Sequence, residues 1–412
     1  MDIRIKPHRL EGTVKIPSSK SLTHRAVICA ALADGISELK NISYSKDIDA
    51  TITAMRNMGA VIEKHGSSLV VTGISESAER MEIECCESGS TLRFLIPIAA
   101  ALGANAVFYG EGRLPERPIT PYVRELPCKG IKLDYHNTMP FSISGQLIGG
   151  DFSLEGDVSS QFVTGLLMAL PLLKDDSRII MTSPLQSKPY ADMTVSCLEK
   201  FGITVEETEY GYFIKGGQKY SPCNMPVEGD YSQAAFFLVG NAIGNRIQLE
   251  NLSENSVQGD KKIVDIISNI CYNEKYEKLD GFDVDVTDIP DLVPALAVLA
   301  SFCKSKSRIY GAERLKIKES DRLAAVSNML NGLGGKVTAL SDGLIIEPVS
   351  MLDGGTVDSC GDHRIAMAAA IASTRCMNDV VILNADSVEK SYPSFFDDFK
   401  NIGGTADVIN LE

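Results

Sequence analysis

Six stretches of the chain share one pattern: a polar turn followed by a helix-length run of small and apolar residues. The turns centre on Ser21, Ser90, Ser160, Asp230, Asp291 and Asp362. They recur roughly every 60 to 70 residues. Runs such as STLRFLIPIAAALG and DHRIAMAAAIAS are apolar on every side after their first turn, which is typical of a buried helix. The pattern predicts six buried helices, each beginning at a polar turn.

A second pattern lies between these helices: an amphipathic helix, a glycine and two short strands. In residues 49–73 the helical spacing of Ile52 and Met55 gives way to strand alternation at Val61 and Val71. The intervening glycine suits the C-terminus of a helix. Similar units occupy 120–145, 192–216 and 321–347, with a shortened unit at 394–409 and a weaker one, without the glycine, at 260–287. Strands that alternate with helices predict an α/β fold.

Three of these units fall in each half of the chain, which predicts two globular domains of three βαβ-type units each. We expect the sheets on the outside of each domain and the apolar helices inside. Candidate crossings between the domains lie near residues 15–19 and 227–229. One domain is then discontinuous, 1–18 plus 229–412, and 19–228 is inserted into it. A simple division at residue 228 is the alternative.

Composition limits the partners of the chain. Its 412 residues carry a formal net charge of −14, which argues against nucleic acid and anionic membranes. Every apolar run is too short to cross a bilayer, and the N-terminal MDIRIKPHRL lacks the apolar core of a signal sequence. The ten cysteines show no paired spacing of the zinc type, and several fall in apolar helices. We therefore expect a reduced, cytoplasmic protein without a metal site.

Charged residues gather where the buried helices begin. The basic ones are Lys20, Arg25, Arg93, Arg113, Arg117, Lys188, Lys318, Arg322, Arg364 and Lys390. Arginine forks suit a bidentate grip on phosphate or carboxylate, and helix N-termini add partial positive charge. Each group alone could be a solvated face or a cap, and Asp291 and Glu319 could simply neutralise nearby bases. Their recurrence at one phase of the repeat predicts instead a single binding site for anions.

Six motifs connect the chain to a known family. They are, in order, IPSSKSLTHRAVICAALADG, GRLPERPI, SSQFVTGLLMALP, SKPYADMT, KIKESDRL and GDHRIAMA. With them, nearly the whole chain resembles the 5-enolpyruvylshikimate-3-phosphate synthase family. The resemblance implies two pseudo-threefold domains of three βαβαββ units, with buried parallel helices and an active site in the cleft between the domains. It also implies a reaction without a cofactor. The 5-hydroxyl of shikimate 3-phosphate attacks C2 of phosphoenolpyruvate, a tetrahedral intermediate forms and phosphate leaves.

The resemblance assigns the polar residues at the helix openings to two substrates. For shikimate 3-phosphate the implied residues are Lys20, Ser21, Arg25, Ser159, Ser160, Gln161, Ser187, Tyr190, Asp291 and Lys318. For phosphoenolpyruvate they are Lys20, Gly89, Arg117, Gln161, Arg322, Arg364 and Lys390. The implied catalytic groups are Asp291, Glu319 and Lys20. We expect Asp291 to take the hydroxyl proton and Glu319 to serve the methylene carbon; the reverse, or a share for Lys20, stays open.

Two residues depart from the family pattern. Glu87 stands where the family usually has Asn, and Arg314 stands where some members have Asn. An anionic Glu87 near the phosphoenolpyruvate site would weaken binding unless it turns away or pairs with Arg93. Sensitivity to glyphosate is therefore left open.

Two other functions compete with this interpretation. The related transferase that acts on UDP-N-acetylglucosamine carries a cysteine in the loop matching residues 110–118, whereas GEGRLPERP has none. A non-catalytic anion-binding relative is the second alternative, and only Glu87 supports it. We therefore expect a monomeric enzyme of the shikimate pathway that binds two small anionic substrates and whose domains close on binding.

Overall fold

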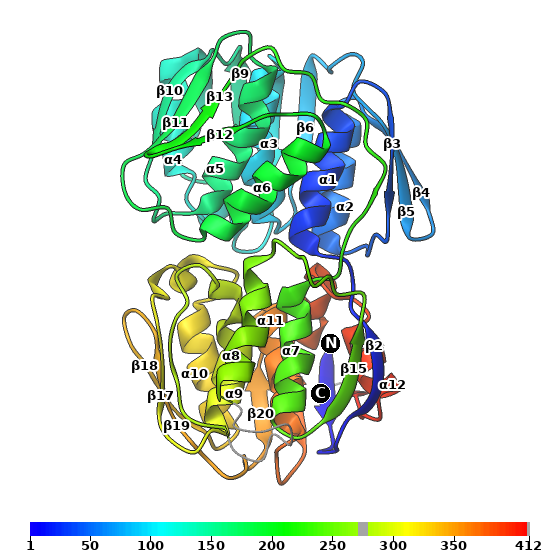
Figure 1. Cartoon of the computed structure of the whole chain (residues 1–412), viewed down its shortest axis with the longest axis vertical. Helices are drawn as coiled ribbons and strands as arrows, with labels where there is room; N and C mark the ends of the chain where they lie inside the picture. Colours follow the sequence, from blue (N-terminus) through cyan, green and yellow to red (C-terminus); the bar gives the residue numbers. More distant parts are fainter. Residues whose placement is uncertain (271–278, 410–412) are drawn as a thin grey trace. The chain divides into compact units, whose positions relative to one another are not determined.

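The computed structural model describes residues 1–270 and 279–409, which form two compact units (Figure 1). The unit that we call terminal comprises Met1–Pro17 and Gly229–Glu412, and the central unit is Ser18–Glu228. The chain passes from one unit to the other after Pro17 and again after Glu228. Residues 271–278, part of the weak repeat expected at 260–287, lie outside the described residues.

The central unit contains three four-stranded sheets of one topology. Its strands are β3 (Ile36–Lys40), β4 (Val61–His65), β5 (Ser68–Thr72), β6 (Arg80–Glu84), β7 (Asn105–Tyr109), β8 (Ile131–Asp134), β9 (Phe141–Gly145), β10 (Gly150–Leu154), β11 (Ser177–Met181), β12 (Glu206–Thr208), β13 (Gly211–Ile214) and β14 (Met225–Pro226). In the sheet β6-β7-β9-β8 the first two strands are parallel, and β9 lies antiparallel to both β7 and β8. The sheet β10-β11-β13-β12 repeats this βαβαββ arrangement. In the third sheet, β14-β3-β5-β4, the first position is filled by β14 from the far end of the unit.

The terminal unit repeats this plan with strands from both ends of the chain. Its strands are β1 (Asp2–Ile5), β2 (Glu11–Lys15), β15 (Arg246–Glu250), β16 (Asp283–Asp285), β17 (Ser307–Tyr310), β18 (Lys336–Ala339), β19 (Leu344–Glu347), β20 (Gly355–Asp358), β21 (Val380–Leu383) and β22 (Asp407–Ile409). The sheet β16-β17-β19-β18 matches those of the central unit. In β20-β21-β1-β22, β1 lies antiparallel to both neighbours, with Ile3 opposite Ile382 and Val408. The third sheet pairs β2 in parallel with β15.

Six helices built of small and apolar residues form the interior, as the sequence pattern predicts. They are α1 (Lys20–Leu32), α3 (Gly89–Ala101) and α5 (Ser160–Ala169) in the central unit, and α7 (Tyr231–Ala242), α9 (Val293–Ser301) and α11 (His363–Ser373) in the terminal unit. Every residue of α9 and α11 is buried. Within the central unit α3 packs against α5, and within the terminal unit α7, α9 and α11 pack against one another. Figure 1 shows the sheets flanking the helices in each unit, so the expected arrangement of sheets outside and helices inside is confirmed.

Polar side chains cap five of these helices. The caps are Ser19, Ser88, Ser159, Asp230 and Asp362, and each accepts a hydrogen bond from a backbone N–H of the first turn. Ser21 and Ser90, expected at helix openings, lie two residues after their caps. The expectation that Asp291 opens a helix is wrong in detail, because it lies in the 3₁₀ turn Pro290–Leu292 and α9 begins at Val293 without a side-chain cap. Two arginines described below bind its carboxylate instead.

The second helix of each of the six βαβαββ repeats is more polar than the buried first helix. These helices are α2 (Lys46–Asn57), α4 (Thr120–Glu125), α6 (Lys188–Lys200), α8 (Lys262–Ile270), α10 (Arg322–Gly332) and α12 (Phe395–Asn401). Short 3₁₀ helices lie at η1 (Leu114–Glu116), η2 (Pro127–Lys129), η3 (Leu170–Leu172), η4 (Gly259–Lys261), η5 (Pro290–Leu292), η6 (Glu313–Ile317) and η7 (Ala385–Lys390). Gly202 and Gly334 follow α6 and α10 with φ of 78° and 90°, the left-handed conformation in which glycine ends a helix.

Across residues 1–270 and 279–409, no helix combines the length and the apolar character that crossing a membrane requires. In the same part of the chain, no group of three or more His, Cys, Asp or Glu side chains is placed to hold a metal ion.

Candidate active site

Two arginines lie over the N-terminus of α3 in the central unit. A Cβ added to Gly89, the first residue of the helix, would lie 2.7 Å from Arg93 Nη1 and 2.9 Å from Arg117 Nη1. Only glycine leaves room for both guanidinium groups at this point. The positive end of the helix and two arginine forks thus meet at one place, which is a favourable arrangement for binding an anion.

Gln161 joins this group from the start of α5. Its Oε1 accepts a hydrogen bond of 2.8 Å from Arg93 Nη1, and its Nε2 donates to Ser90 Oγ over 3.0 Å. The buried Nε of Arg117 has no hydrogen-bond partner among the described residues. We call Gly89, Arg93, Arg117 and Gln161 the α3 cluster. The sequence noted Arg93 as a base at a helix opening but assigned it no substrate.

Lys20, the first residue of α1, forms an ion pair that the sequence did not reveal. Its Nζ lies 2.8 Å from Asp47 Oδ2, and both side chains are largely buried. Asp47 lies in the first turn of α2, where an acidic residue ordinarily complements the helix dipole. An acidic residue in a first turn was therefore the only sequence signal at Asp47, and it gave no indication of the contact with Lys20.

Arg25 lies deep in the central unit and ties α1 to α6. It donates to Thr194 Oγ1 over 2.9 Å, to the Tyr190 carbonyl oxygen over 2.8 Å and to the Ser21 carbonyl oxygen over 2.7 Å. Burial lowers the pKa of Arg25 to about 10, so the guanidinium stays charged at neutral pH. Arg25 therefore brings Ser21 and Tyr190, both predicted substrate residues, close to one buried cation.

The predicted serines lie at helix starts. Ser159 caps α5 by accepting from the Gln161 N–H over 3.3 Å, and Ser160 is buried as its first residue. Ser187 precedes α6 in a left-handed conformation, with φ of 57° and ψ of 37°. A residue other than glycine in this region is strained, and such residues cluster at functional sites.

Arg322 organises the acidic residues of the terminal unit. Its Nη1, Nη2 and Nε donate to Asp291 Oδ1, Glu319 Oε2 and Asp362 Oδ2, each over 2.9 Å. Only 1% of the Arg322 side chain is exposed. One buried guanidinium thus orients both carboxylates that the sequence proposed for acid–base chemistry. We call these four residues, with Arg364, the carboxylate cluster.

Arg364 holds the second oxygen of Asp291. Its Nη2 donates to Asp291 Oδ2 over 2.9 Å, and its Nη1 donates to Ser232 Oγ. Burial by itself would raise the pKa of Asp291, but the cations Arg364, Lys318 and Arg322 outweigh burial and hold that pKa well below its usual range. Asp291 is therefore ionised at neutral pH in the absence of substrates.

Lys390 and the start of α11 lie beside the carboxylate cluster. Lys390 Nζ donates to the Gly361 carbonyl oxygen over 2.8 Å, next to the cap of α11. Asp362, which is fully buried, caps that helix by accepting from the Arg364 N–H over 3.0 Å. Lys318 is extended and precedes α10, which begins only at Arg322, so the two residues do not share a helix face. Sequence reasoning gave Asp362 a capping role but not its contact with Arg322.

The two departures from the family pattern have defined positions. A Cβ on Gly112 would lie 2.5 Å from the carboxyl carbon of Glu87, so the Glu87 side chain packs against the loop 110–118. Arg314 Nη2 donates to the Thr287 carbonyl oxygen over 3.0 Å.

Comparisons with known proteins identify the family of the chain. The family model of EPSP synthase (3-phosphoshikimate 1-carboxyvinyltransferase) matches residues 5–399. The 3-phosphoshikimate 1-carboxyvinyltransferase of Clostridium perfringens (strain 13 / Type A) is 46% identical over 414 residues, which cover 97% of this chain and 98% of the relative. That of Clostridium kluyveri is 46% identical over 420 residues, covering 98% of each chain.

A solved structure shows the same fold. EPSP synthase from Acinetobacter baumannii superposes with a TM-score of 0.83 at 26% identity, covering 99% of this chain and 100% of the other. The six motifs, the repeat architecture, the family model and the near-full-length relatives all agree. The chain therefore belongs to the EPSP synthase family, the 3-phosphoshikimate 1-carboxyvinyltransferases.

Proposed function

We propose that the protein transfers the enolpyruvyl group of phosphoenolpyruvate to the 5-hydroxyl of shikimate 3-phosphate and releases phosphate. Family membership supports the reaction. The observation that carries the proposal in this chain is the contact of one buried guanidinium, that of Arg322, with both Asp291 and Glu319. The reaction needs a base and an acid, and two carboxylates held in fixed positions can supply them.

The basic residues are proposed to bind the anionic groups of the substrates. Two substrates that each carry a phosphate and a carboxylate bring on the order of six negative charges. The α3 cluster and Lys20 are proposed to bind phosphoenolpyruvate, together with Arg322, Arg364 and Lys390. The buried Nε of Arg117 has no hydrogen-bond partner among the residues that the structure describes, and this supports the assignment because a bound anion would satisfy it.

Shikimate 3-phosphate is assigned mainly to the starts of α1, α5 and α6. Its proposed contacts are Lys20, Ser21, Arg25, Ser159, Ser160, Gln161, Ser187, Tyr190, Asp291 and Lys318. Backbone N–H groups and hydroxyls at the starts of α5 and α6 are suitable donors for phosphate oxygens. The hydrogen bonds of Arg25 to the backbone of Ser21 and Tyr190 support a common site for these two residues.

Substrate binding is proposed to prepare Asp291 as a base. In the free protein Arg322 and Arg364 hold its pKa so low that it would accept a proton poorly. Substrate anions that engage the same arginines add negative charge beside Asp291 and draw the guanidinium groups away from it. Both effects raise the pKa of Asp291 toward the range in which a carboxylate accepts a hydroxyl proton.

The proton transfers divide between the two carboxylates in this proposal. Asp291 takes the proton of the 5-hydroxyl as the oxygen attacks C2 of phosphoenolpyruvate, and Glu319 gives a proton to the methylene carbon. Removing a proton from the resulting methyl group then expels phosphate from the tetrahedral intermediate. The reverse division, or a share for Lys20, is the alternative. The two units are proposed to be the domains of the enzyme, acting on the same pair of substrates.

An assay of phosphate release tests the proposal. Release should require phosphoenolpyruvate and shikimate 3-phosphate together and should be absent when either is omitted. Release with UDP-N-acetylglucosamine in place of shikimate 3-phosphate would contradict the proposed acceptor, and no release with either acceptor would support the non-catalytic relative. The monomeric state and the cytoplasmic location stay predictions, which sedimentation and cell fractionation would check.

A further inference from the structure

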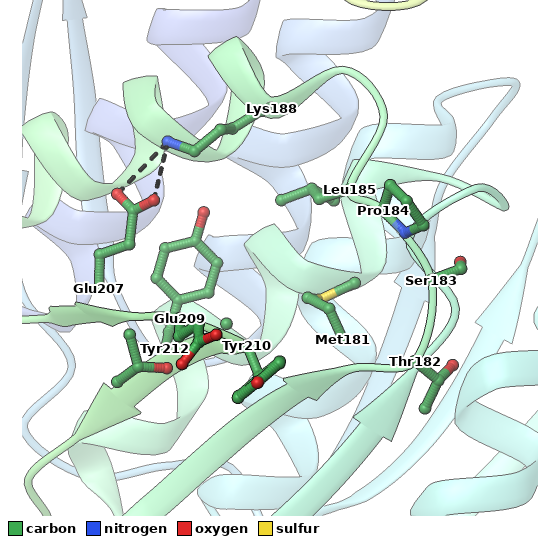
Figure 2. A pocket seen from close by; sticks show the side chains of 12 residues that line it. Met181, Thr182, Ser183, Pro184, Leu185, Lys188, Glu207, Glu209, Tyr210 and Tyr212 are labelled. Carbon is green, nitrogen blue, oxygen red and sulfur yellow. Dashed lines mark hydrogen bonds and ion pairs between the residues drawn. The ribbon is translucent and has the colours of Figure 1, made fainter.

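A pocket of about 420 Å³ lies in the central unit at one end of the sheet β10-β11-β13-β12 (Figure 2). It is bordered by the end of β11, the segment 182–185, the start of α6 and the β12–β13 hairpin. No residue that lines it has been assigned to either substrate above. Its volume falls in the range of small-molecule sites.

Hydrogen bonds donated by main-chain N–H groups hold the walls of this pocket. The Met181 N–H donates to the Tyr210 carbonyl oxygen over 2.7 Å, which ties the end of β11 to the hairpin turn. The Thr182 N–H donates to the Leu154 carbonyl oxygen over 2.8 Å, and the Gly156 N–H donates to Ser183 Oγ over 2.9 Å. The walls are therefore ordered without a ligand, so binding would cost little conformational entropy for ordering the pocket.

One buried polar group in the pocket lacks a partner. The Tyr212 side chain is 2% exposed, and its hydroxyl makes no hydrogen bond with any residue that the structure describes. Figure 2 shows this hydroxyl on the side of the pocket where Lys188 and Glu207 lie. Burial raises the pKa of Tyr212 to about 12, so the hydroxyl keeps its proton. Buried hydroxyls are normally satisfied, and an oxygen atom of a ligand would satisfy this one.

Charge around the pocket favours a cation. Lys188 Nζ is neutralised by Asp192 Oδ1 at 2.6 Å and Glu207 Oε1 at 3.2 Å (Figure 2). Glu209 adds a further carboxylate to the lining. Two carboxylates thus pair with one lysine, and a further carboxylate lies in the lining. The remaining lining includes the apolar side chains of Met181 and Leu185.

We propose that this pocket binds a small organic cation: a flat apolar ring against Met181 and Leu185, an ammonium group at Glu209, and an oxygen atom bonded to the Tyr212 hydroxyl. An ammonium group suits the acidic mouth, and the apolar lining suits the ring. Tyramine carries all three groups and serves as the probe. Phenethylamine lacks only the hydroxyl, and 3-(4-hydroxyphenyl)propionate replaces the ammonium with a carboxylate.

Calorimetric titration of the full chain without substrates tests the site, so its outcome does not depend on catalysis. We expect saturable binding of tyramine, with phenethylamine weaker by about three- to tenfold, the range for one neutral hydrogen bond. The carboxylate analogue should bind much more weakly. In Tyr212→Phe the two amines should bind equally, and in Glu209→Gln, which leaves the Lys188 ion pairs intact, both should bind more weakly.

Tyr135→Phe is the matched control, because Tyr135 packs on Phe141 in a different sheet. It should leave all three affinities unchanged. The proposal is overturned if tyramine shows no saturable binding up to about 10 mM. It is equally overturned if the carboxylate analogue binds as well as tyramine, or if Tyr212→Phe preserves the preference for tyramine over phenethylamine.

Discussion

Arg322 Nη1 donates to Asp291 Oδ1 over 2.9 Å, and Arg364 holds the other oxygen of the same carboxylate at 2.9 Å. Both oxygens of the proposed base are thus occupied by arginines that are also proposed to bind substrate. In the free protein Asp291 is ionised but weakly basic. A substrate anion that competes for the same arginines would raise its pKa.

This relationship predicts how Asp291 affects stability as the pH falls. Because its pKa is lowered by folding, ionised Asp291 stabilises the folded chain above its unfolded pKa of about 3.9, and that stabilisation is lost as the pH falls further. Asp291→Asn should therefore have a lower free energy of unfolding than the unmodified chain. This gap between the two proteins should be largest near neutral pH and should narrow below about pH 4. Urea titrations across this range measure it. Asp283→Asn, at an exposed position, should lower the free energy of unfolding only slightly; an Asp291→Asn gap that widens in acid would contradict the account.

Asp362 should be important for stability, because it is fully buried against Arg322 and caps α11. Asp362→Ala leaves the buried Arg322 without one of its three carboxylates and should lower the free energy of unfolding by about 3 kcal/mol or more. Urea unfolding measures the change. Asp397→Ala removes only an exposed pair with Lys400 and should change it by less than about 1 kcal/mol. Equal effects of the two substitutions would show that the buried contact is unimportant.

Gly89→Ala should impair binding more than folding. The new Cβ would meet the ends of two flexible side chains, Arg93 and Arg117, which can move aside without disturbing the backbone. Displaced guanidinium groups bind an anion less tightly, so KM for phosphoenolpyruvate should rise at least about tenfold while Tm changes little. Gly240→Ala, in a buried helix where a Cβ meets atoms no closer than 3.5 Å, is the control and should keep KM. An unchanged KM in Gly89→Ala would show that the α3 cluster does not bind phosphoenolpyruvate.

Lys20→Ala should both raise KM for phosphoenolpyruvate and slow turnover, because Lys20 is proposed to contact the donor substrate. Asp47→Asn keeps the lysine but removes its ion pair of 2.8 Å, so it should have a smaller effect of the same kind. Lys64→Ala removes a lysine from an exposed pair with Asp49 and should leave the kinetics unchanged. Steady-state kinetics of the three variants would separate these roles; normal kinetics in Lys20→Ala would mean that the lysine only pairs with Asp47.

Local pattern predicted the six buried helices because each apolar run is long and starts at a polar turn. The glycines after α6 and α10 were predictable for a similar reason, since their left-handed conformation excludes most other residues. The position of β1 between β21 and β22 was not, because that pairing joins residues almost 400 positions apart and depends on the completed fold.

The same limit applies to the candidate site. Residue type and spacing indicated which bases lie at helix starts, but not which carboxylate each contacts. The partnerships of Lys20 with Asp47 and of Arg322 with Asp362 both join different elements. Periodicity describes one element at a time, so Asp47 resembled an ordinary first-turn residue and Asp362 an ordinary cap.

The central claim is that Asp291 and Glu319 carry the proton transfers of one enolpyruvyl transfer. Its most direct test is the turnover number for phosphate release, with both substrates saturating, in Asp291→Asn and Glu319→Gln alongside the exposed control Asp283→Asn. The account predicts that each carboxylate variant loses at least about a hundredfold in turnover, the lower range for loss of a general acid or base, while the control turns over normally. Near-normal turnover in both carboxylate variants would contradict it.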